Sequence, residues 1–170
     1  MSENVLEEMN DGAVNLRDPK SGMQYSIYGL PQAAAVVSID GRIEHLSCVA
    51  ERSGLRRVCD YLVVARRDGK ESYDAVLIEM KTTLGVDEKH RDQLRRSKPI
   101  LEYLRELCAV EYERKVIISI KYAIVASKIS ERLDKQPTRM GPIYGEDETY
   151  KGIRIRRLIG RGAAFRHFVK

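Results

Sequence analysis

The chain has 170 residues, of which 43% are hydrophobic and 32% are charged, and its formal net charge is +5. This length and composition suit a folded globular domain and exclude an intrinsically disordered chain. No apolar run approaches the roughly 20 residues that span a bilayer, and the acidic N-terminus lacks a signal-peptide pattern, so we expect a cytoplasmic protein without a membrane partner.

Residues 1–30 are the hardest part of the sequence to assign. Turn signals stand at 10–12 and 19–22, and no clear strand or helix is predicted around them. We therefore expect a poorly defined N-terminal segment, 1–30, followed by a single domain over residues 31–170 that ends in a basic strand and tail.

Four strands in succession are predicted after residue 30. The apolar runs 34–39 and 42–49 are joined by a hairpin signal, and the runs 58–64 and 75–81 flank a turn at Asp68-Gly69. The third run is rich in β-branched residues. Short polar turns between consecutive strands predict an antiparallel meander.

A helical pattern follows between residues 87 and 107. Its apolar stripe consists of Leu94, Leu101, Leu104 and Cys108, with charged residues on the other side. Pro99 lacks an amide donor, so we expect it to kink or interrupt this helix.

The remaining elements complete a mixed sheet. The run 116–125 predicts a long strand near the centre of the sheet, Ser127 is expected to cap a short helix that reaches Leu133, and residues 135–150 are expected to form a loop. A last strand is predicted over 153–158. This order of elements predicts an α/β fold with a mixed central sheet, an antiparallel meander and flanking helices.

Three charged residues, Asp60, Glu79 and Lys81, stand inside strands that are otherwise apolar. Strand alternation puts Glu79 and Lys81 on one face with Leu77, and a two-residue turn at Asp68-Gly69 would pair position 60 with position 77. Asp60 and Glu79 would then be diagonal neighbours, about 7–8 Å apart at the backbone. A longer loop would shift this register.

Two carboxylates this close repel each other unless a cation lies between them. Magnesium prefers hard oxygen ligands and needs only one or two carboxylates besides water and substrate phosphate. Lys81 is placed to orient or deprotonate an attacking water, or to offset charge on a phosphate. The alternative is a solvated sheet face on which Glu79 and Lys81 form an ion pair. The apolar character of both strand faces favours a functional site, because an inward charge needs a reason.

The sequence around these residues resembles a known family. The run Val58-Cys59-Asp60-Tyr61-Leu62, a hairpin, the run Leu77-Ile78-Glu79-Met80-Lys81 and a helix resemble the core of the PD-(D/E)xK, or restriction-endonuclease-like, superfamily. The resemblance covers roughly residues 58–125. It implies a restriction-endonuclease-like fold with Asp60, Glu79 and Lys81 as catalytic residues. It also implies that Asp60, Glu79 and Met80 hold Mg²⁺ or Mn²⁺.

Other positions agree with the superfamily only in part. Gln93 resembles the glutamine that follows the motif in several branches, and its alternative is a plain exposed helix residue. Cys59 stands before Asp60, where the motif has proline. An additional acid usually comes from a preceding helix, and four glutamates are candidates for it: Glu7, Glu8, Glu44 and Glu51.

The C-terminal end of the sequence is basic. Residues 151–170 contain seven Lys or Arg and no acid. Such a stretch suggests a polyanionic partner, although it can also serve solubility alone. We expect four arginines to contact DNA phosphates: Arg154, Arg156, Arg157 and Arg161. DNA is the expected partner, and a homodimer is a further expectation, because enzymes that cut both strands often pair.

The remaining reactive side chains suggest no other chemistry. The cysteines Cys48, Cys59 and Cys108 lack metal-binding spacing and are expected to be reduced core thiols. His45 and His90 are expected to be packing or surface residues, because no activated nucleophile accompanies them.

The sequence thus predicts a metal-dependent nuclease that hydrolyses phosphodiester bonds in DNA. The alternative is a catalytically weak or inactive protein of the same fold. Such a protein would act as a nucleic-acid-binding, regulatory or protein-interaction module.

Overall fold

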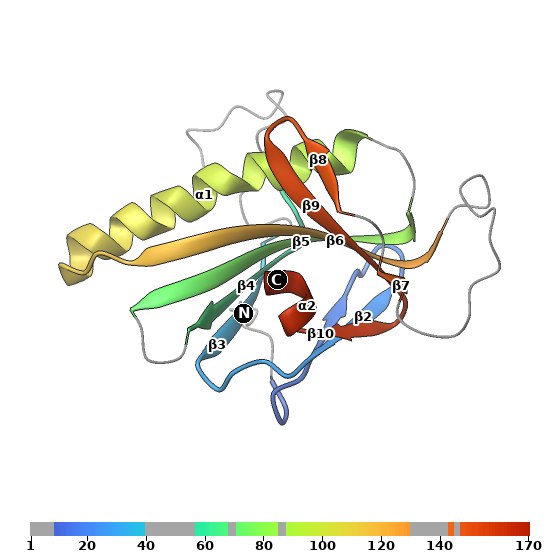
Figure 1. The fold of residues 1–170 in the computed structure, drawn as a ribbon, viewed down its shortest axis with the longest axis horizontal. Coiled ribbons are helices and arrows are strands. Elements are labelled where there is room, and N and C mark those ends of the chain that lie inside the picture. Colours follow the sequence, from blue (N-terminus) through green and yellow to red (C-terminus); the bar gives the residue numbers. More distant parts are fainter. Residues whose placement is uncertain (1–8, 40–56, 68–70, 85–87, 130–142, 145–146) are drawn as a thin grey trace.

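The computed structural model describes residues 9–39, 57–67, 71–84, 88–129, 143–144 and 147–170. They form a mixed α/β protein with two sheets, a larger one in the order β3-β4-β5-β6-β9-β7 and a smaller one in the order β1-β2-β10. Helix α1 (Glu88–Tyr112) covers one face of the larger sheet, and the smaller sheet and α2 (Arg166–Val169) cover the other (Figure 1). Among the described residues, no helix is long and apolar enough to cross a membrane.

The larger sheet begins with an antiparallel meander. β3 (Ala34–Ser38) pairs with β4 (Tyr61–Arg66), which pairs with β5 (Ser72–Leu84). The strands predicted near 34–39, 58–64 and 75–81 are therefore confirmed. Because β3 and β4 are direct neighbours, no strand stands between them, contrary to the predicted order. The second predicted strand, 42–49, lies outside the described residues.

Two parallel strands extend the sheet beyond β5. α1 leads into β6 (Ile117–Ile129), which runs parallel to β5, and β9 (Ile153–Ile159) runs parallel to β6. The strands predicted at 116–125 and 153–158 are confirmed. The helix predicted to begin at Ser127 is wrong there, because pairing with β5 carries β6 on to Ile129 and Ser127 Oγ donates to the Thr82 carbonyl at 2.6 Å.

The expected loop at 135–150 contains two short strands in its described part. β7 (Ile143–Tyr144) and β8 (Glu148–Tyr150) both pair antiparallel with β9. Lys151 and Gly152 join β8 to β9 with φ values of 45° and 83°, as two-residue hairpin turns require. Strands of two and three residues are too short to show an alternating pattern, which is why the sequence concealed them.

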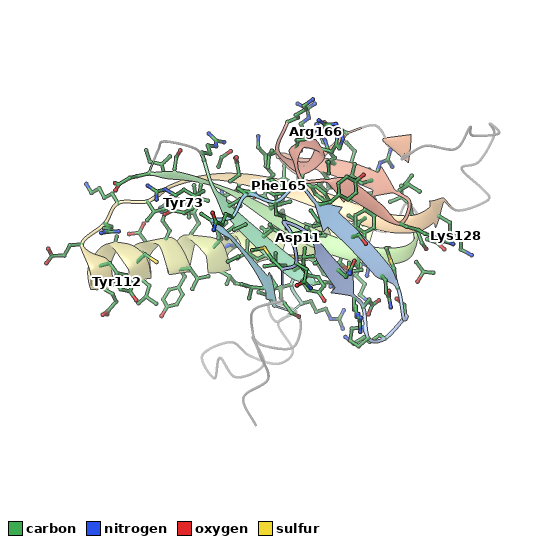
Figure 2. All side chains as sticks on the ribbon, turned by 90° about the horizontal axis from the view of Figure 1, so that it is seen from below. Asp11, Tyr73, Tyr112, Lys128, Phe165 and Arg166 are labelled. Carbon is green, nitrogen blue, oxygen red and sulfur yellow. The ribbon has the colours of Figure 1, made fainter. Side chains whose placement is uncertain are left out.

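Helix α1 packs against the sheet along its first half only. Leu94, Ser97 and Leu101 are buried, whereas Leu104 is 41% exposed, so the predicted apolar stripe holds for the first half of the helix. The helix continues through Pro99 without interruption, and Pro99 itself is exposed. Figure 2 places Tyr112, the last residue of α1, at the opposite end of the molecule from Lys128 near the end of β6.

The smaller sheet joins the two ends of the chain. β1 (Val14–Arg17) and β2 (Gln24–Tyr28) form a hairpin, and β10 (Gly162–Ala164) pairs parallel with β2. The segment expected to be poorly defined thus contains a β-hairpin within residues 9–30, and the basic tail contains β10 and α2. Leu16, Ile27 and Phe168 are buried in one core with side chains of the larger sheet, and this tertiary packing stabilises strands too short to predict.

Candidate active site

Glu79 is a fully buried carboxylate on an inner strand of the sheet. It pairs with Ile124 of β6, and none of its surface is exposed. Strand alternation puts it on the α1 face, as expected, with Leu77 before it and Lys81 after it. Because burying a charge costs free energy unless partners compensate it, the groups around this side chain determine what it can do.

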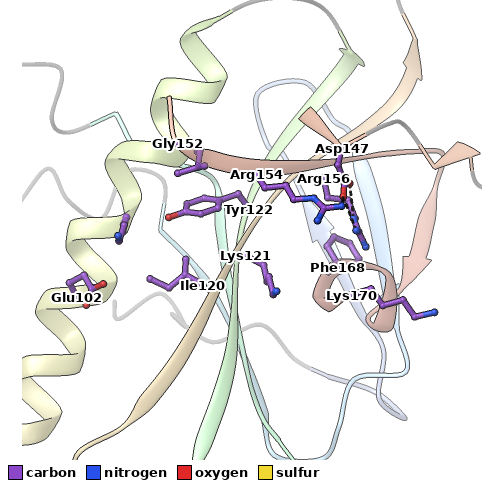
Figure 3. Close-up of a pocket in the computed structure, with 12 residues that line it drawn as sticks. Glu102, Ile120, Lys121, Tyr122, Asp147, Gly152, Arg154, Arg156, Phe168 and Lys170 are labelled. Carbon is purple, nitrogen blue, oxygen red and sulfur yellow. Dashed lines mark hydrogen bonds and ion pairs between the residues drawn. The ribbon is translucent and has the colours of Figure 1, made fainter. Parts of the chain in front are cut away.

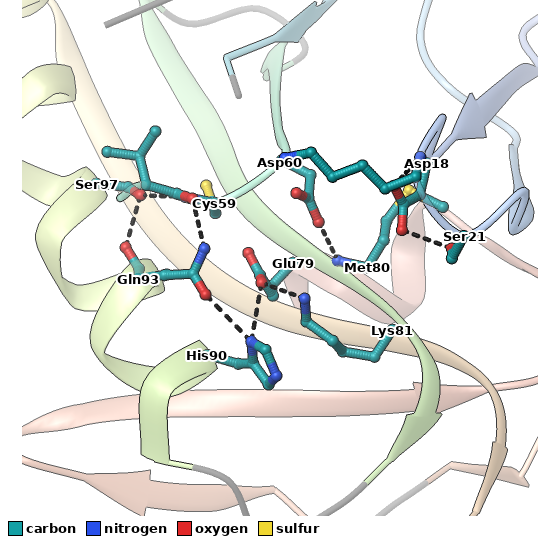
Figure 4. Close-up of polar contacts among 12 residues, drawn as sticks. Asp18, Ser21, Cys59, Asp60, Glu79, Met80, Lys81, His90, Gln93 and Ser97 are labelled. Atoms are coloured by element: carbon teal, nitrogen blue, oxygen red, sulfur yellow. Dashed lines mark hydrogen bonds and ion pairs between the residues drawn. The ribbon is translucent and has the colours of Figure 1, made fainter. Parts of the chain in front are cut away.

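Asp60 lies immediately before β4 and next to Glu79. Tyr61 pairs with Ile78 as the last pair between β4 and β5, so Asp60 lies one residue beyond the paired register, at the end nearest Glu79. The predicted pairing of 60 with 77 is two residues off, because residues 67–71 connect β4 to β5 in place of a two-residue turn. Asp60 Oδ2 accepts a hydrogen bond from the Met80 amide at 2.6 Å, which fixes this carboxylate beside Glu79 (Figure 4).

The side chains of a lysine and a histidine contact the same oxygen of Glu79. Lys81 Nζ lies 2.7 Å from Glu79 Oε1, and His90 Nδ1 lies 3.2 Å from the same atom (Figure 4). Neither contact has the geometry of a good hydrogen bond. At 2.7 Å the ion pair with Lys81 nevertheless compensates charge on Oε1, since Coulomb attraction depends on distance more than on direction.

The other oxygen, Glu79 Oε2, is buried without a hydrogen-bond partner among the described residues. A buried carboxylate oxygen in this state costs free energy that a well-satisfied core would not carry. Among the described residues, Glu79 is the only charged side chain with buried oxygens that lack a hydrogen-bond partner.

Helix α1 supports the segment that carries Asp60. Gln93 Nε2 donates to the Val58 carbonyl at 3.1 Å, and the Cys59 amide donates to Ser97 Oγ at 2.9 Å. Ser97 Oγ in turn donates to the Gln93 carbonyl at 2.8 Å. These bonds tie the two residues before Asp60 to one turn of the helix.

Gln93 and His90 are therefore not surface residues. The Gln93 amide nitrogen faces the Val58 carbonyl, so its Oε1 faces His90 Nδ1 at 3.1 Å. His90 Nδ1 thus faces two oxygen atoms, Gln93 Oε1 and Glu79 Oε1. The exposed-residue alternative for Gln93 is therefore wrong, whereas His90, 23% exposed at its side chain, packs between α1 and Glu79. His45 lies outside the described residues.

Ser97 is a polar residue at a position where the helical pattern calls for an apolar one. Ser97 interrupts the apolar stripe between Leu94 and Leu101 and has no exposed surface. A serine at a core position of an amphipathic helix needs a hydrogen-bond partner, and here the partner is the strand segment that leads to the site. His90 gave no comparable signal, because its role depends on the way α1 docks on β5.

Cys59 lies beside the site but is not a reactive thiol. Burial raises the pKa of the Cys59 thiol far above its usual range, and the nearby charges of Glu79 and Asp60 raise it further, so it stays protonated. Cys59 and Cys108 are free thiols, Cys59 buried as expected and Cys108 partly exposed. Cys48 lies outside the described residues.

The four glutamates expected to supply an additional acid, Glu7, Glu8, Glu44 and Glu51, all lie outside the described residues. The described part of the chain contains no group of three His, Cys, Asp or Glu side chains placed to hold a metal.

Asp18, in the turn between β1 and β2, is an acid that sequence reasoning missed. Burial alone would raise its pKa, but hydrogen bonds from Ser21 and Lys20 and the charge of Lys81 lower it below the usual value.

The four arginines expected to bind DNA have different environments. Arg156 forms two hydrogen bonds to Asp147, each 2.9 Å long, and a third to the His167 carbonyl at 2.6 Å. Arg154 also meets Asp147, at 2.6 Å, with its side chain 74% exposed. Arg157 lies 3.4 Å from Glu148, and Arg161 is exposed. The four predicted phosphate contacts stay a prediction, and Arg156 is the one whose guanidinium is already held by Asp147 and the His167 carbonyl.

The chain was compared with known proteins at three levels. No family model, no curated protein and no solved structure matches it. The arrangement of its own residues therefore carries the functional argument.

Proposed function

We propose that this protein is a metal-dependent nuclease that hydrolyses phosphodiester bonds in DNA. The observation that carries the proposal is Glu79, a buried carboxylate whose two oxygens lack a hydrogen-bond partner among the described residues, with Asp60 bonded to the next residue of the strand, Met80. A pair of acids on adjacent strands, an orphan oxygen and a lysine two residues further along are the groups that divalent-metal hydrolysis needs.

The residues fit a hard divalent cation in number and type. Asp60 and Glu79 supply two carboxylates, and magnesium takes its remaining ligands from water and substrate phosphate. The Met80 amide occupies one lone pair of Asp60 Oδ2, and an ionised carboxylate has about four such sites. The notion of Met80 as a third ligand rests on the family resemblance alone. A bound Mg²⁺ would supply charge neutralisation at the phosphate and a more acidic water.

The protein's own side chains would perform the remaining tasks. Lys81 and His90 contact Glu79 Oε1, so Oε2 is the oxygen that would bind the metal. Lys81 remains 26% exposed at its side chain, so it can reach a phosphate or an attacking water as well as Glu79. Gln93 orients the His90 ring through Nδ1, and Ser97 fixes the backbone that leads to Asp60.

The order of elements supports the same proposal. The superfamily resemblance requires a strand with an acid, a hairpin, a strand with the E-x-K residues, a helix and a further strand. The chain supplies these as β4 with the residue before it, β5, α1 and β6, with β6 parallel to β5. A restriction-endonuclease-like fold is part of the proposal, because shared topology without a matching structure is an analogy.

A second candidate function is a nuclease-like protein with little or no catalysis that binds nucleic acid or another protein. The absence of a three-residue ligand group from the described residues favours it. The short Glu79–Lys81 ion pair favours it as well, because a lysine engaged by its own glutamate is less available to a substrate.

Cleavage assays distinguish the two functions. We expect the protein to nick plasmid, single-stranded or branched DNA in 10 mM Mg²⁺ or Mn²⁺, and EDTA should stop the reaction. Asp60→Asn and Glu79→Gln should abolish it, whereas Glu106→Gln, a change at an exposed residue of α1, should leave it unchanged. Protein that binds DNA but cleaves none of these substrates with either metal would support the second function instead.

A further inference from the structure

A second site of interest lies where β9 begins to pair with β6. The first pair between these strands joins Tyr122 to Ile155, so β6 residues before Tyr122 have no β9 partner. A pocket of about 400 Å³ opens at this point, between α1, the β8–β9 turn and α2. In Figure 3 the Tyr122 side chain projects toward α1, while Phe168 and Lys170 lie on the opposite side of the pocket.

The lining of this pocket is rich in positive charge. Five cationic side chains and two carboxylates contribute to it. Both carboxylates are already engaged by arginines. Glu102 lies 2.8 Å from Arg105, which is outside the pocket, and Asp147 lies 2.6 Å from Arg154 and 2.9 Å from Arg156.

Three lysines, Lys98, Lys121 and Lys170, line the pocket, and no side-chain carboxylate of the described residues forms an ion pair with any of them. Lys121 is the most informative of them, because it sits half-buried in β6. An anion bound in the pocket would neutralise its ammonium charge, for which no side-chain carboxylate of the described residues forms an ion pair.

The pocket lies close to the candidate active site. Tyr122 pairs with Leu77, and both lie on the α1 face two residues before Ile124 and Glu79 on their respective strands. One strand spacing and two residues of rise separate the Tyr122 and Glu79 backbones by about 8 Å. Lys121, one residue before Tyr122, points to the opposite face of the sheet, the side on which α2 lies.

We propose that this pocket is a phosphate-binding site. Lysine ammonium groups bind phosphate as point charges from several directions, which suits three lysines on different elements. That the phosphate belongs to a nucleic-acid strand rests on the proposed function, and a free nucleotide is the other source with the same chemistry. The sequence pointed to the arginines of β9, but two of these are held by Asp147, and the unpaired charge belongs to lysines that no motif marked.

Binding measurements without metal test the site independently of catalysis. Fluorescence anisotropy of labelled single-stranded and duplex DNA, in EDTA and over a series of KCl concentrations, gives the slope of log K against log salt. The pocket variant is Lys98→Gln/Lys121→Gln. The matched control is Arg114→Gln/Lys115→Gln, which removes the same charge from two exposed residues beyond the end of α1.

The pocket variant should lower the slope by about 1.8 on duplex DNA and about 1.4 on single strands, and the control should keep the wild-type slope. Equal slopes for the two variants would overturn the assignment to a strand. Pyrophosphate titrated into the wild type provides the second arm. Calorimetric binding that the pocket variant loses, with DNA slopes unchanged, would identify a free phosphate compound as the ligand. No difference between the variants in either arm would overturn the site itself.

The effects of the variants on folding and on cleavage are measured separately from their effect on binding. Should the double variant melt well below the wild type, Lys98→Gln alone carries the test, with an expected slope change of about 0.9, because Lys98 is exposed. A slope change in a protein that never cleaves DNA would keep the phosphate site and overturn the nuclease. Cleavage together with unchanged slopes would keep the nuclease and overturn the phosphate site.

Discussion

Replacing Glu79 by Gln tests whether this side chain is held for a ligand or for the fold. The variant keeps the shape of the side chain and removes its charge. A structural ion pair would lose stability, because removing one partner of a buried pair typically costs 3–5 kcal/mol when the other charge stays buried. Lys81 is 26% exposed at its side chain, so it can turn its ammonium group to water. The change also removes the desolvation of a fully buried carboxylate and its repulsion with Asp60.

We therefore expect the metal-free melting temperature of Glu79→Gln to equal or exceed that of the wild type. Magnesium should stabilise only the wild type. For a dissociation constant of about 1 mM, 10 mM Mg²⁺ contributes about 1.4 kcal/mol, which raises the melting temperature of a domain of this size by about 3–6 °C.

Melting curves of both proteins with and without 10 mM Mg²⁺ measure these shifts, and Glu106→Gln serves as the control for a charge change on the exposed surface. A lower metal-free melting temperature for Glu79→Gln, together with no magnesium effect on the wild type, would refute the metal-site assignment and support a structural ion pair.

Further expectations concern the residues that support the two sites. Ser97→Ala leaves the buried Cys59 amide without its acceptor, so it should cost about 1–3 kcal/mol in denaturant unfolding and reduce cleavage as Asp60 shifts. Arg156→Ala should lower the melting temperature, whereas Arg154→Ala, 74% exposed, should not. The hydrogen bond from Arg156 lowers the pKa of Asp147. The ion pair therefore stabilises the fold fully above the unfolded pKa of Asp147, near 4, and this contribution is lost as the pH falls through the lower folded pKa. Asp147→Asn should consequently flatten the acid limb of a curve of stability against pH.

The sequence predicted the parts of the fold that depend on local pattern. β-branched runs and turn signals located the strands that carry Glu79 and follow Asp60, and helical spacing located α1. The face shared by Glu79 and Lys81 followed from strand alternation alone. The register did not, because it depends on the length of the 67–71 connection, which a turn signal at Asp68-Gly69 does not fix.

The features that escaped prediction are those made by tertiary contacts. β1 and β2 are four and five residues long and form a sheet only with β10 from the other end of the chain. His90 reaches Glu79 because α1 crosses β5 at its first turn, and no spacing along the sequence encodes that crossing. The arginines of β9 looked alike in sequence, and only their distances to Asp147 and Glu148 separate structural from exposed charge.

Direct measurement of metal binding tests the central claim that Asp60 and Glu79 form a divalent-metal site. Titration of Mn²⁺ followed by the electron paramagnetic resonance signal of the free ion gives the bound fraction, with a cleavage-resistant phosphorothioate duplex present to supply the phosphate ligand. Wild type and Glu106→Gln should bind Mn²⁺ equally, and Glu79→Gln and Asp60→Asn should lose that binding. Equal Mn²⁺ binding by all four proteins, or no binding by the wild type, would contradict the claim that Asp60 and Glu79 form a metal site.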